Sequence, residues 1–77
     1  MEAYVLIKIR SGEVREVVRQ LRRINNITEA NMTFGPFDAV AIVKVDNLNK
    51  LGQIIASDVQ PIPGVIETLT CLAVEIG

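Results

Sequence analysis

Apolar residues recur at two different spacings along the chain, and these spacings divide it into segments. Residues 3–10 alternate between an apolar side and a mixed side, which predicts a β-strand. From residue 14 to residue 24 the apolar positions recur every third or fourth residue, which predicts an amphipathic helix. The same succession of a strand and then a helix repeats over residues 38–59.

A further strand is expected after each helix. The first spans about residues 27–34, and its polar residues favour a position at an edge of the sheet. The second spans about residues 65–76 and is partly apolar on both sides, so its pattern does not indicate which side is buried. The resulting order of elements is β-α-β-β-α-β.

This order predicts one domain over residues 1–77 with the ferredoxin-like α+β fold. Right-handed crossovers and short connections leave few topologies for such an order. The simplest of them is an antiparallel sheet with both helices on one face. Ser11 is the expected N-cap of the first helix, and Asp46 or Asn47 is the expected N-cap of the second.

The sheet face without helices is expected to be apolar. It should carry Tyr4, Leu6, Val40 and Ile42. A sheet face exposed to solvent is normally more polar than this. Two copies with these faces packed together would bury the apolar residues as in a β-sandwich. We therefore expect a homodimer whose interface contains these four residues.

The composition supports association and excludes several other classes of protein. The chain has 77 residues, and 49% of them are apolar, which is a high share for so small a domain. The single cysteine excludes an internal disulfide, and the absence of histidine argues further against a metal site. Small domains without such supports often depend on oligomerisation. We therefore expect no metal and no cofactor.

Charge and hydropathy argue against nucleic acids and membranes as partners. The net charge is −1 and the pI is about 5.3, whereas a non-specific nucleic-acid binder needs many basic residues. No apolar run approaches the ~20 residues that cross a bilayer. The chain also enters its first strand at once, with no cleavable leader. A reduced cytoplasmic location is therefore expected.

Catalytic patterns are scarce, so we do not expect an enzyme. The chain has no histidine base and no Gly-x-Ser-x-Gly turn. Cys71, in the last strand, is expected to be a small buried hydrophobic residue. Arg15, Arg19 and Arg22 form a stripe on the first helix. This stripe is either a solvated helix face, with Glu16 in pairing range, or a contact for phosphates.

Two polar features allow more than one interpretation. The first is the turn at residues 35–38, Gly-Pro-Phe-Asp, where Asp38 either accepts backbone amides or offers a carboxylate to a ligand. The second is the pair Thr68 and Thr70, which share a side-chain direction on the last strand, although threonine is common in strands. A carboxylate, turn amides and two hydroxyls match the polar groups of a free amino acid.

These features resemble those of a known family. The turn at residues 35–38 resembles the Gly-x-x-Asp turn of the effector domain of Lrp/AsnC regulators, also called the RAM domain. The stretch Pro63-Gly64-Val65, followed by two threonines, resembles the last strand of that domain. The resemblance extends over essentially the whole chain. It implies a ferredoxin-like unit that dimerises through its sheet, dimers that assemble into rings, and small effectors that bind near the contact between dimers.

The resemblance also implies which residues bind the effector. They are Gly35, Phe37, Asp38, Thr68 and Thr70. Full-length relatives carry an N-terminal helix-turn-helix, which has no counterpart here. We therefore expect an amino-acid-sensing and oligomerisation module without direct DNA binding, which forms dimers and rings of dimers and can join a full-length regulator. The alternative is a purely structural module that co-oligomerises with such a regulator and binds no metabolite.

Overall fold

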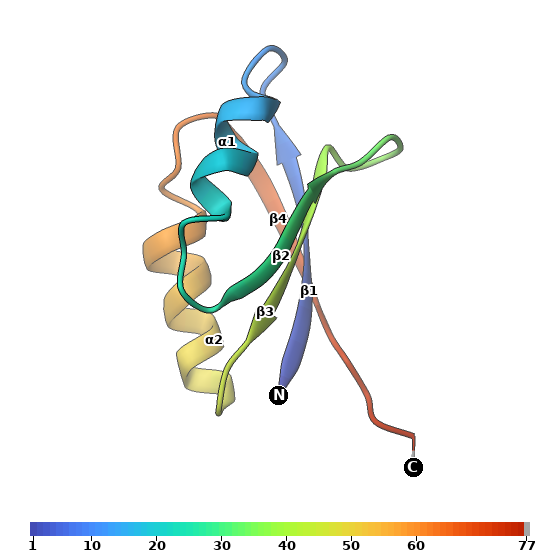
Figure 1. Ribbon diagram of the computed structural model, residues 1–77, viewed down its shortest axis with the longest axis vertical. Coiled ribbons are helices and arrows are strands. Elements are labelled where there is room, and N and C mark those ends of the chain that lie inside the picture. The colour runs from blue at the N-terminus through green and yellow to red at the C-terminus, as the bar shows by residue number, and fades with distance from the viewer. Residues whose placement is uncertain (77) are drawn as a thin grey trace.

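The computed structural model describes residues 1–76 and has the expected order of elements (Figure 1). Its elements are β1 (Glu2–Ile9), α1 (Val14–Leu21), β2 (Ile27–Met32), β3 (Ala39–Lys44), α2 (Leu48–Ile54), the π-helical turn η1 (Ile55–Val59) and β4 (Val65–Leu72). The strands pair antiparallel in the order β2-β3-β1-β4. Both helices lie on one face of this sheet (Figure 1), so the prediction of a ferredoxin-like fold is confirmed.

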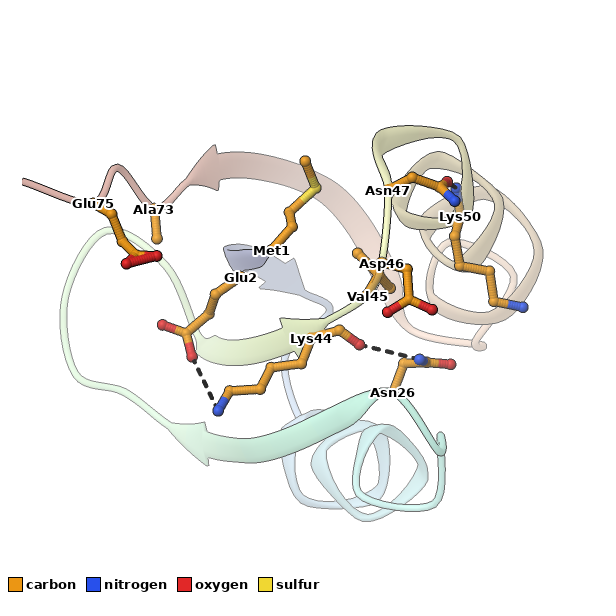
Figure 2. Close-up of a pocket in the computed structure, with 10 residues that line it drawn as sticks. All are labelled: Met1, Glu2, Asn26, Lys44, Val45, Asp46, Asn47, Lys50, Ala73 and Glu75. Carbon is orange, nitrogen blue, oxygen red and sulfur yellow. Dashed lines mark hydrogen bonds and ion pairs between the residues drawn. The ribbon is translucent and has the colours of Figure 1, made fainter.

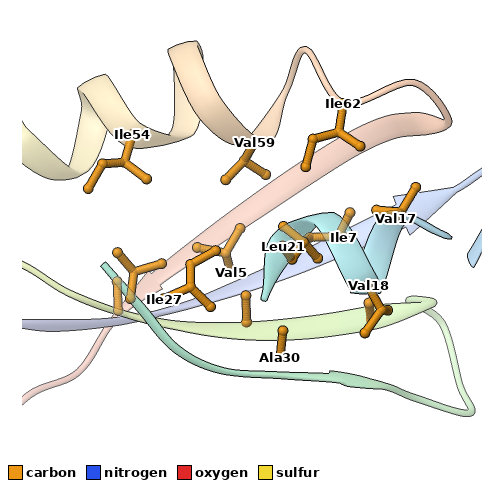
Figure 3. Packing of buried hydrophobic residues seen from close by; sticks show 14 of the residues in the cluster. Val5, Ile7, Val17, Val18, Leu21, Ile27, Ala30, Ile54, Val59 and Ile62 are labelled. Carbon is orange, nitrogen blue, oxygen red and sulfur yellow. The ribbon is translucent and has the colours of Figure 1, made fainter. Parts of the chain in front are cut away.

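The core lies between the helices and the sheet (Figure 3). Val5 and Ile7 of β1 are fully buried on the helix side, as the alternation predicts. Helix α1 contributes Val17 and Leu21, which are also fully buried. Burial of each such branched side chain stabilises the fold by about 1.5–3 kcal/mol. The apolar alternation of β1 and the helical spacing of α1 therefore mark the two sides of one packed layer.

Small side chains on the two strands nearest α1 leave room for that helix. Ala39 and Ala41 of β3 are fully buried. Ala30 of β2 is buried too and lies opposite Ala41 in the register. Close packing requires that large and small side chains alternate across an interface. Leu21 and Val18 of α1 occupy the space over this part of the sheet (Figure 3).

Strand β2 departs from the strict alternation that the sequence predicts. Ile27 and Ala30 are both buried, although alternation places residues at this spacing on opposite faces. The register of β2 against β3 shifts between Ile27 and Glu29. Such a shift is typical of a β-bulge, which adds one residue to one strand of a pair. The strand ends at Met32 rather than at residue 34, and it lies at an edge as predicted.

The expected helix caps are confirmed for only one of the two helices. Ser11 does not cap α1, because the chain turns at Gly12, with φ of 88°, before the helix begins. Glu13 occupies the N-cap position and forms no capping hydrogen bond with its side chain. At α2 the side chain of Asn47 accepts a hydrogen bond from the backbone N–H of Lys50 at 2.8 Å.

The connection that leads into β4 packs tightly against α1. Gly64 has φ of 103°, and its carbonyl accepts a hydrogen bond from the backbone N–H of Arg10 at 2.7 Å. A Cβ at this position would lie 3.1 Å from Cβ of Glu13 and 3.2 Å from Cγ2 of Val17. The backbone conformation and the close approach of α1 both require glycine here. The Pro-Gly-Val stretch therefore has a structural role.

Replacement of Gly64 by alanine should destabilise the protein by about 1–3 kcal/mol, because the new Cβ is strained at positive φ and presses on α1. Gly52→Ala is the matched control. Gly52 lies inside α2, and a Cβ there meets nothing within 4 Å, so this change should stabilise the protein by about 0.5–1 kcal/mol. Urea unfolding measures both effects. A Gly64→Ala variant as stable as the unchanged protein would contradict this account.

Candidate functional site

The sheet face opposite the helices carries the four apolar residues predicted for it. Tyr4 pairs with Ile42, and Leu6 pairs with Val40, so the four side chains lie together on the central strands β1 and β3. Tyr4 is 39% exposed and the other three are half-buried. Residues of β1 on the other face are fully buried under the helices. The described elements therefore leave an apolar surface without cover.

Strand β4 adds two residues to this surface that the sequence alone did not assign. Leu69 lies opposite Leu6, and Cys71 lies opposite Tyr4. Leu69 is 48% exposed and Cys71 is also exposed. The prediction that Cys71 is buried is therefore wrong, because its register places it on the helix-free side of an edge strand. We call the six residues the uncovered face: Tyr4, Leu6, Val40, Ile42, Leu69 and Cys71.

Polar residues border the uncovered face at one end and along β2. Glu2 forms an ion pair with Lys44 at 3.8 Å and accepts a hydrogen bond from the hydroxyl of Tyr4 at 3.3 Å. On β2, Asn31 donates to the carboxylate of Glu29 at 2.8 Å. An apolar centre within a polar rim is the usual anatomy of a protein–protein interface.

Asp38 closes one end of the β1–β3 pair. Its backbone N–H donates to the carbonyl of Ile7 at 2.9 Å, and its carboxylate Oδ2 accepts from the backbone N–H of Ile9 at 2.8 Å. A carboxylate that accepts a backbone amide forms a charge-assisted hydrogen bond. The capping interpretation of Asp38 is thus realised in the fold. Among residues 1–76, only the Oδ2 atom of this carboxylate has an internal partner.

The other turn residues are held less tightly. Phe37 is half-buried, and its carbonyl accepts a hydrogen bond from the hydroxyl of Thr33 at 2.8 Å. Gly35 is exposed and its φ is not positive. A Cβ at position 35 would meet nothing within 4 Å. The fold of the single chain therefore does not require a glycine at this position.

Thr68 and Thr70 lie on the helix side of β4. Their register partners on β1 are Ile7 and Val5, which are buried beneath the helices. Thr68 is half-buried, and its hydroxyl accepts a hydrogen bond from the side-chain amide of Gln60 at 3.1 Å. Thr70 is exposed because β4 is an edge strand that the helices do not fully cover.

The structure brings Asp38 and Thr68 to the same end of the sheet without forming a closed pocket. Both residues neighbour Ile7, one on each side of β1. Two strand spacings separate them, which amounts to about 10 Å. Thr70 lies opposite Val5, further along the same strand. The predicted effector residues therefore form an open group at one end of the sheet.

Two surface depressions lie away from this group. One is at the opposite end of the sheet, where Glu2, Lys44, Asp46, Lys50 and Glu75 contribute charged groups (Figure 2). Another lies between the turn after α1 and η1. None of the predicted effector residues lines either depression. Sequence reasoning missed both, because each joins residues from elements that only the folded chain brings together.

Two of the three arginines in the stripe have partners among residues 1–76. Arg19 forms an ion pair with Glu16 at 2.7 Å, and Gln20 donates to the same carboxylate at 3.1 Å. The Nε atom of Arg22 donates to the carbonyl of Ala30 at 2.9 Å. Such pairs on an exposed helix contribute only a few tenths of a kcal/mol each. They favour the interpretation of the stripe as a solvated helix face.

Two further features bear on the class of site. In the part of the chain that the structure describes, no group of three or more His, Cys, Asp or Glu residues is arranged to hold a metal ion. Within the same residues, no helix has the length and apolar character that a membrane crossing requires.

Comparison with known proteins agrees with this architecture. The model of the Lrp/AsnC ligand binding domain matches residues 2–76. The HTH-type transcriptional regulator FL11 of Pyrococcus abyssi (strain GE5 / Orsay) is 31% identical over 75 residues, which cover 97% of this chain and 49% of FL11. The chain thus spans about half the length of that relative.

Solved structures share the fold over nearly the whole chain. TTHA0845 from Thermus thermophilus superposes with a TM-score of 0.93 at 26% identity, covering 99% of this chain and 95% of that one. The transcriptional regulator NMB0573 from Neisseria meningitidis, solved as a complex with L-Met, superposes with a TM-score of 0.86 at 14% identity, covering 96% of this chain and 49% of that one. The second likeness shows the fold alone.

The family match and the β-α-β-β-α-β sheet support the same assignment. The match begins at the first residue of β1 and extends beyond β4, so it includes every element of the fold. The resemblance of the turn at residues 35–38 and of the last strand is therefore confirmed at the level of the family. The chain belongs to the Lrp/AsnC ligand binding domain family.

Proposed function

We propose that this chain is a module that senses a small molecule, with an amino acid as its effector, and that assembles through its sheet. The observation that carries the assembly part of the proposal is the uncovered face, an apolar surface on the central strands for which residues 1–76 provide no cover. A solvated sheet face is normally polar. An apolar one within a polar rim fits a second subunit better than it fits water.

A homodimer is the simplest assembly that covers this face. Two copies related by a twofold axis present the same surface to each other, which is the commonest arrangement of soluble oligomers. Packed sheets about 10 Å apart would interdigitate the side chains of both faces. Leu6 stands between Val40 and Leu69 in the register, so it occupies the middle of the contact.

Leu6→Lys should convert the dimer to monomers, because it places a charge in the middle of the apolar contact. The isolated chain should tolerate the change, since position 6 then faces solvent. Leu48→Lys is the matched control: Leu48 is 57% exposed on α2, on the other side of the sheet, and this variant should stay dimeric. Analytical ultracentrifugation measures both states. A folded dimer formed by Leu6→Lys would refute the proposed interface.

The proposed effector site is the end of the sheet where Asp38 and Thr68 lie. Gly35 supports this choice, because the chain itself does not require a glycine there. A glycine lets a ligand or a second subunit approach the backbone closely. The second oxygen of Asp38 is available to an ammonium group, and the turn amides to a carboxylate. The site is open in one chain, and a second dimer packed against it would exclude water.

An amino acid is the effector class that best fits these groups. It presents one ammonium and one carboxylate, and NMB0573, which shares the fold, was solved with L-Met. Ligands that bind the native state raise its melting temperature by mass action. A thermal-shift screen against the common amino acids therefore identifies the effector.

Asp38→Asn should weaken the binding of that effector at residues 35–38 by roughly ten- to a hundred-fold, because a charged hydrogen bond is worth about 1.5–3 kcal/mol. Asparagine retains an oxygen for the N–H of Ile9, so the fold should keep this contact. Asp46→Asn, at the other end of the sheet, is the matched control. Amide NMR signals of residues 35–38 report binding during titration. Equal affinities of Asp38→Asn and the unchanged protein would exclude the proposed role.

The second candidate is a structural assembly module that joins a full-length regulator and binds no metabolite. The internal hydrogen bonds of Asp38 and Thr68 favour it, because they occupy groups that a ligand would use. Failure of every amino acid to bind at millimolar concentration, together with co-purification with such a regulator, would favour this candidate.

A further inference from the structure

The depression between α1 and η1 has two walls from different parts of the chain. Arg23 and Asn25, in the turn between α1 and β2, form one wall. Ser57 and Asp58, in η1, form the other. Figure 1 shows this turn passing beside the segment that continues α2. The depression lies on the helix side of the molecule and is separate from the uncovered face.

The two walls carry opposite charges. Arg23 presents a guanidinium, and Asp58 on the other wall presents a carboxylate. Within residues 1–76 neither side chain belongs to an ion pair, so the two groups do not neutralise each other by direct contact. Arg15 is exposed on α1 but does not line the depression. The pair therefore leaves a cation and an anion free to meet a ligand from two sides.

Apolar side chains also line the depression. Ile62 is 7% exposed and belongs to the core. Ile24 is half-buried and packs against the core cluster. These side chains are held by the packing of both helices on the sheet. The depression is open and most of its lining is polar, so a ligand there would be held mainly by its charged groups, with these two side chains as the apolar contact.

The π-helical turn shapes the second wall. The backbone N–H of Gln60 donates to the carbonyl of Ile55 at 2.8 Å, five residues earlier, so the turn is wider than an α-helical one. Ser57 and Asp58 lie inside this turn. π-Helical turns are rare, and they occur frequently at functional sites because they redirect side chains. The π-helical turn is an observation independent of the two charges, and it lies at the same depression.

We propose that this depression binds a small zwitterion with an aliphatic part, at a site separate from the group around Asp38 and Thr68. Arg23 holds the carboxylate through its planar fork of N–H donors. Asp58 accepts the ammonium group. Ile24 and Ile62 contact the aliphatic part. One chain supplies all of these groups, so binding does not depend on assembly.

L-Leucine is the first probe, since it has both charges and an aliphatic side chain. Its titration should shift the amide NMR signals of residues 23–26 and 57–58. Arg23→Gln and Asp58→Asn should each weaken binding by roughly tenfold or more. Arg15→Gln, the matched control on α1, should leave the affinity unchanged. Asp38→Asn should also leave these signals unchanged, which separates this site from the one under Proposed function.

Two half-ligands assign the contacts. 4-Methylpentanoate lacks the ammonium, so its binding should depend on Arg23 and not on Asp58. Isoamylamine lacks the carboxylate and should show the opposite dependence. The proposal is overturned if L-leucine at millimolar concentration shifts none of these signals. It is equally overturned if Arg23→Gln and Asp58→Asn bind as well as Arg15→Gln.

Discussion

Strand β1 forms hydrogen bonds with β3 on one side and with β4 on the other, and its alternation divides the molecule into two layers. Its odd-numbered residues are buried under the helices, and its even-numbered ones face away from them. The turn at residues 35–38 and the connection into β4 both attach to the C-terminal end of this strand. Asp38 is hydrogen-bonded to Ile7 and Ile9. Gly64 is hydrogen-bonded to Arg10, the residue that follows β1. A change in the register of β1 would therefore move the core, the uncovered face and the effector group together.

The strands with one face under the helices and the other face free of them were predictable from the sequence. β1 and β3 alternate cleanly because helices cover one side and no element within residues 1–76 covers the other. β4 has apolar residues on both sides, and only its pairing with β1 shows that Leu69 and Cys71 share the side of Leu6. The bulge in β2 could not be predicted from the sequence either, because it too depends on the pairing with a neighbouring strand. Local spacing cannot show that Ile27 and Ala30 both turn inward, because the partner strand determines the shift.

The candidate sites were predictable to different degrees. The turn at residues 35–38 is contiguous in sequence, so its residues could be named, and the two roles of Asp38 could be stated but not separated. The structure adds the hydrogen bond from the N–H of Ile9, a partner that is distant in sequence, while the ligand role stays a proposal. Nothing in the sequence indicated a site at Arg23 and Asp58, because each is an ordinary exposed charge. Only the fold places both of them at one depression. A sequence motif can indicate a local turn, whereas a cleft between two elements depends on their packing.

The position of Cys71 has a practical consequence. Cysteine reactivity depends strongly on access to the thiol, and the sulfur of Cys71 lies on the uncovered face, beside Tyr4. The chain has a single cysteine, so alkylation by a thiol reagent reports on this place alone. In the proposed dimer the partner would cover this thiol, so slower labelling at higher protein concentration would report on assembly.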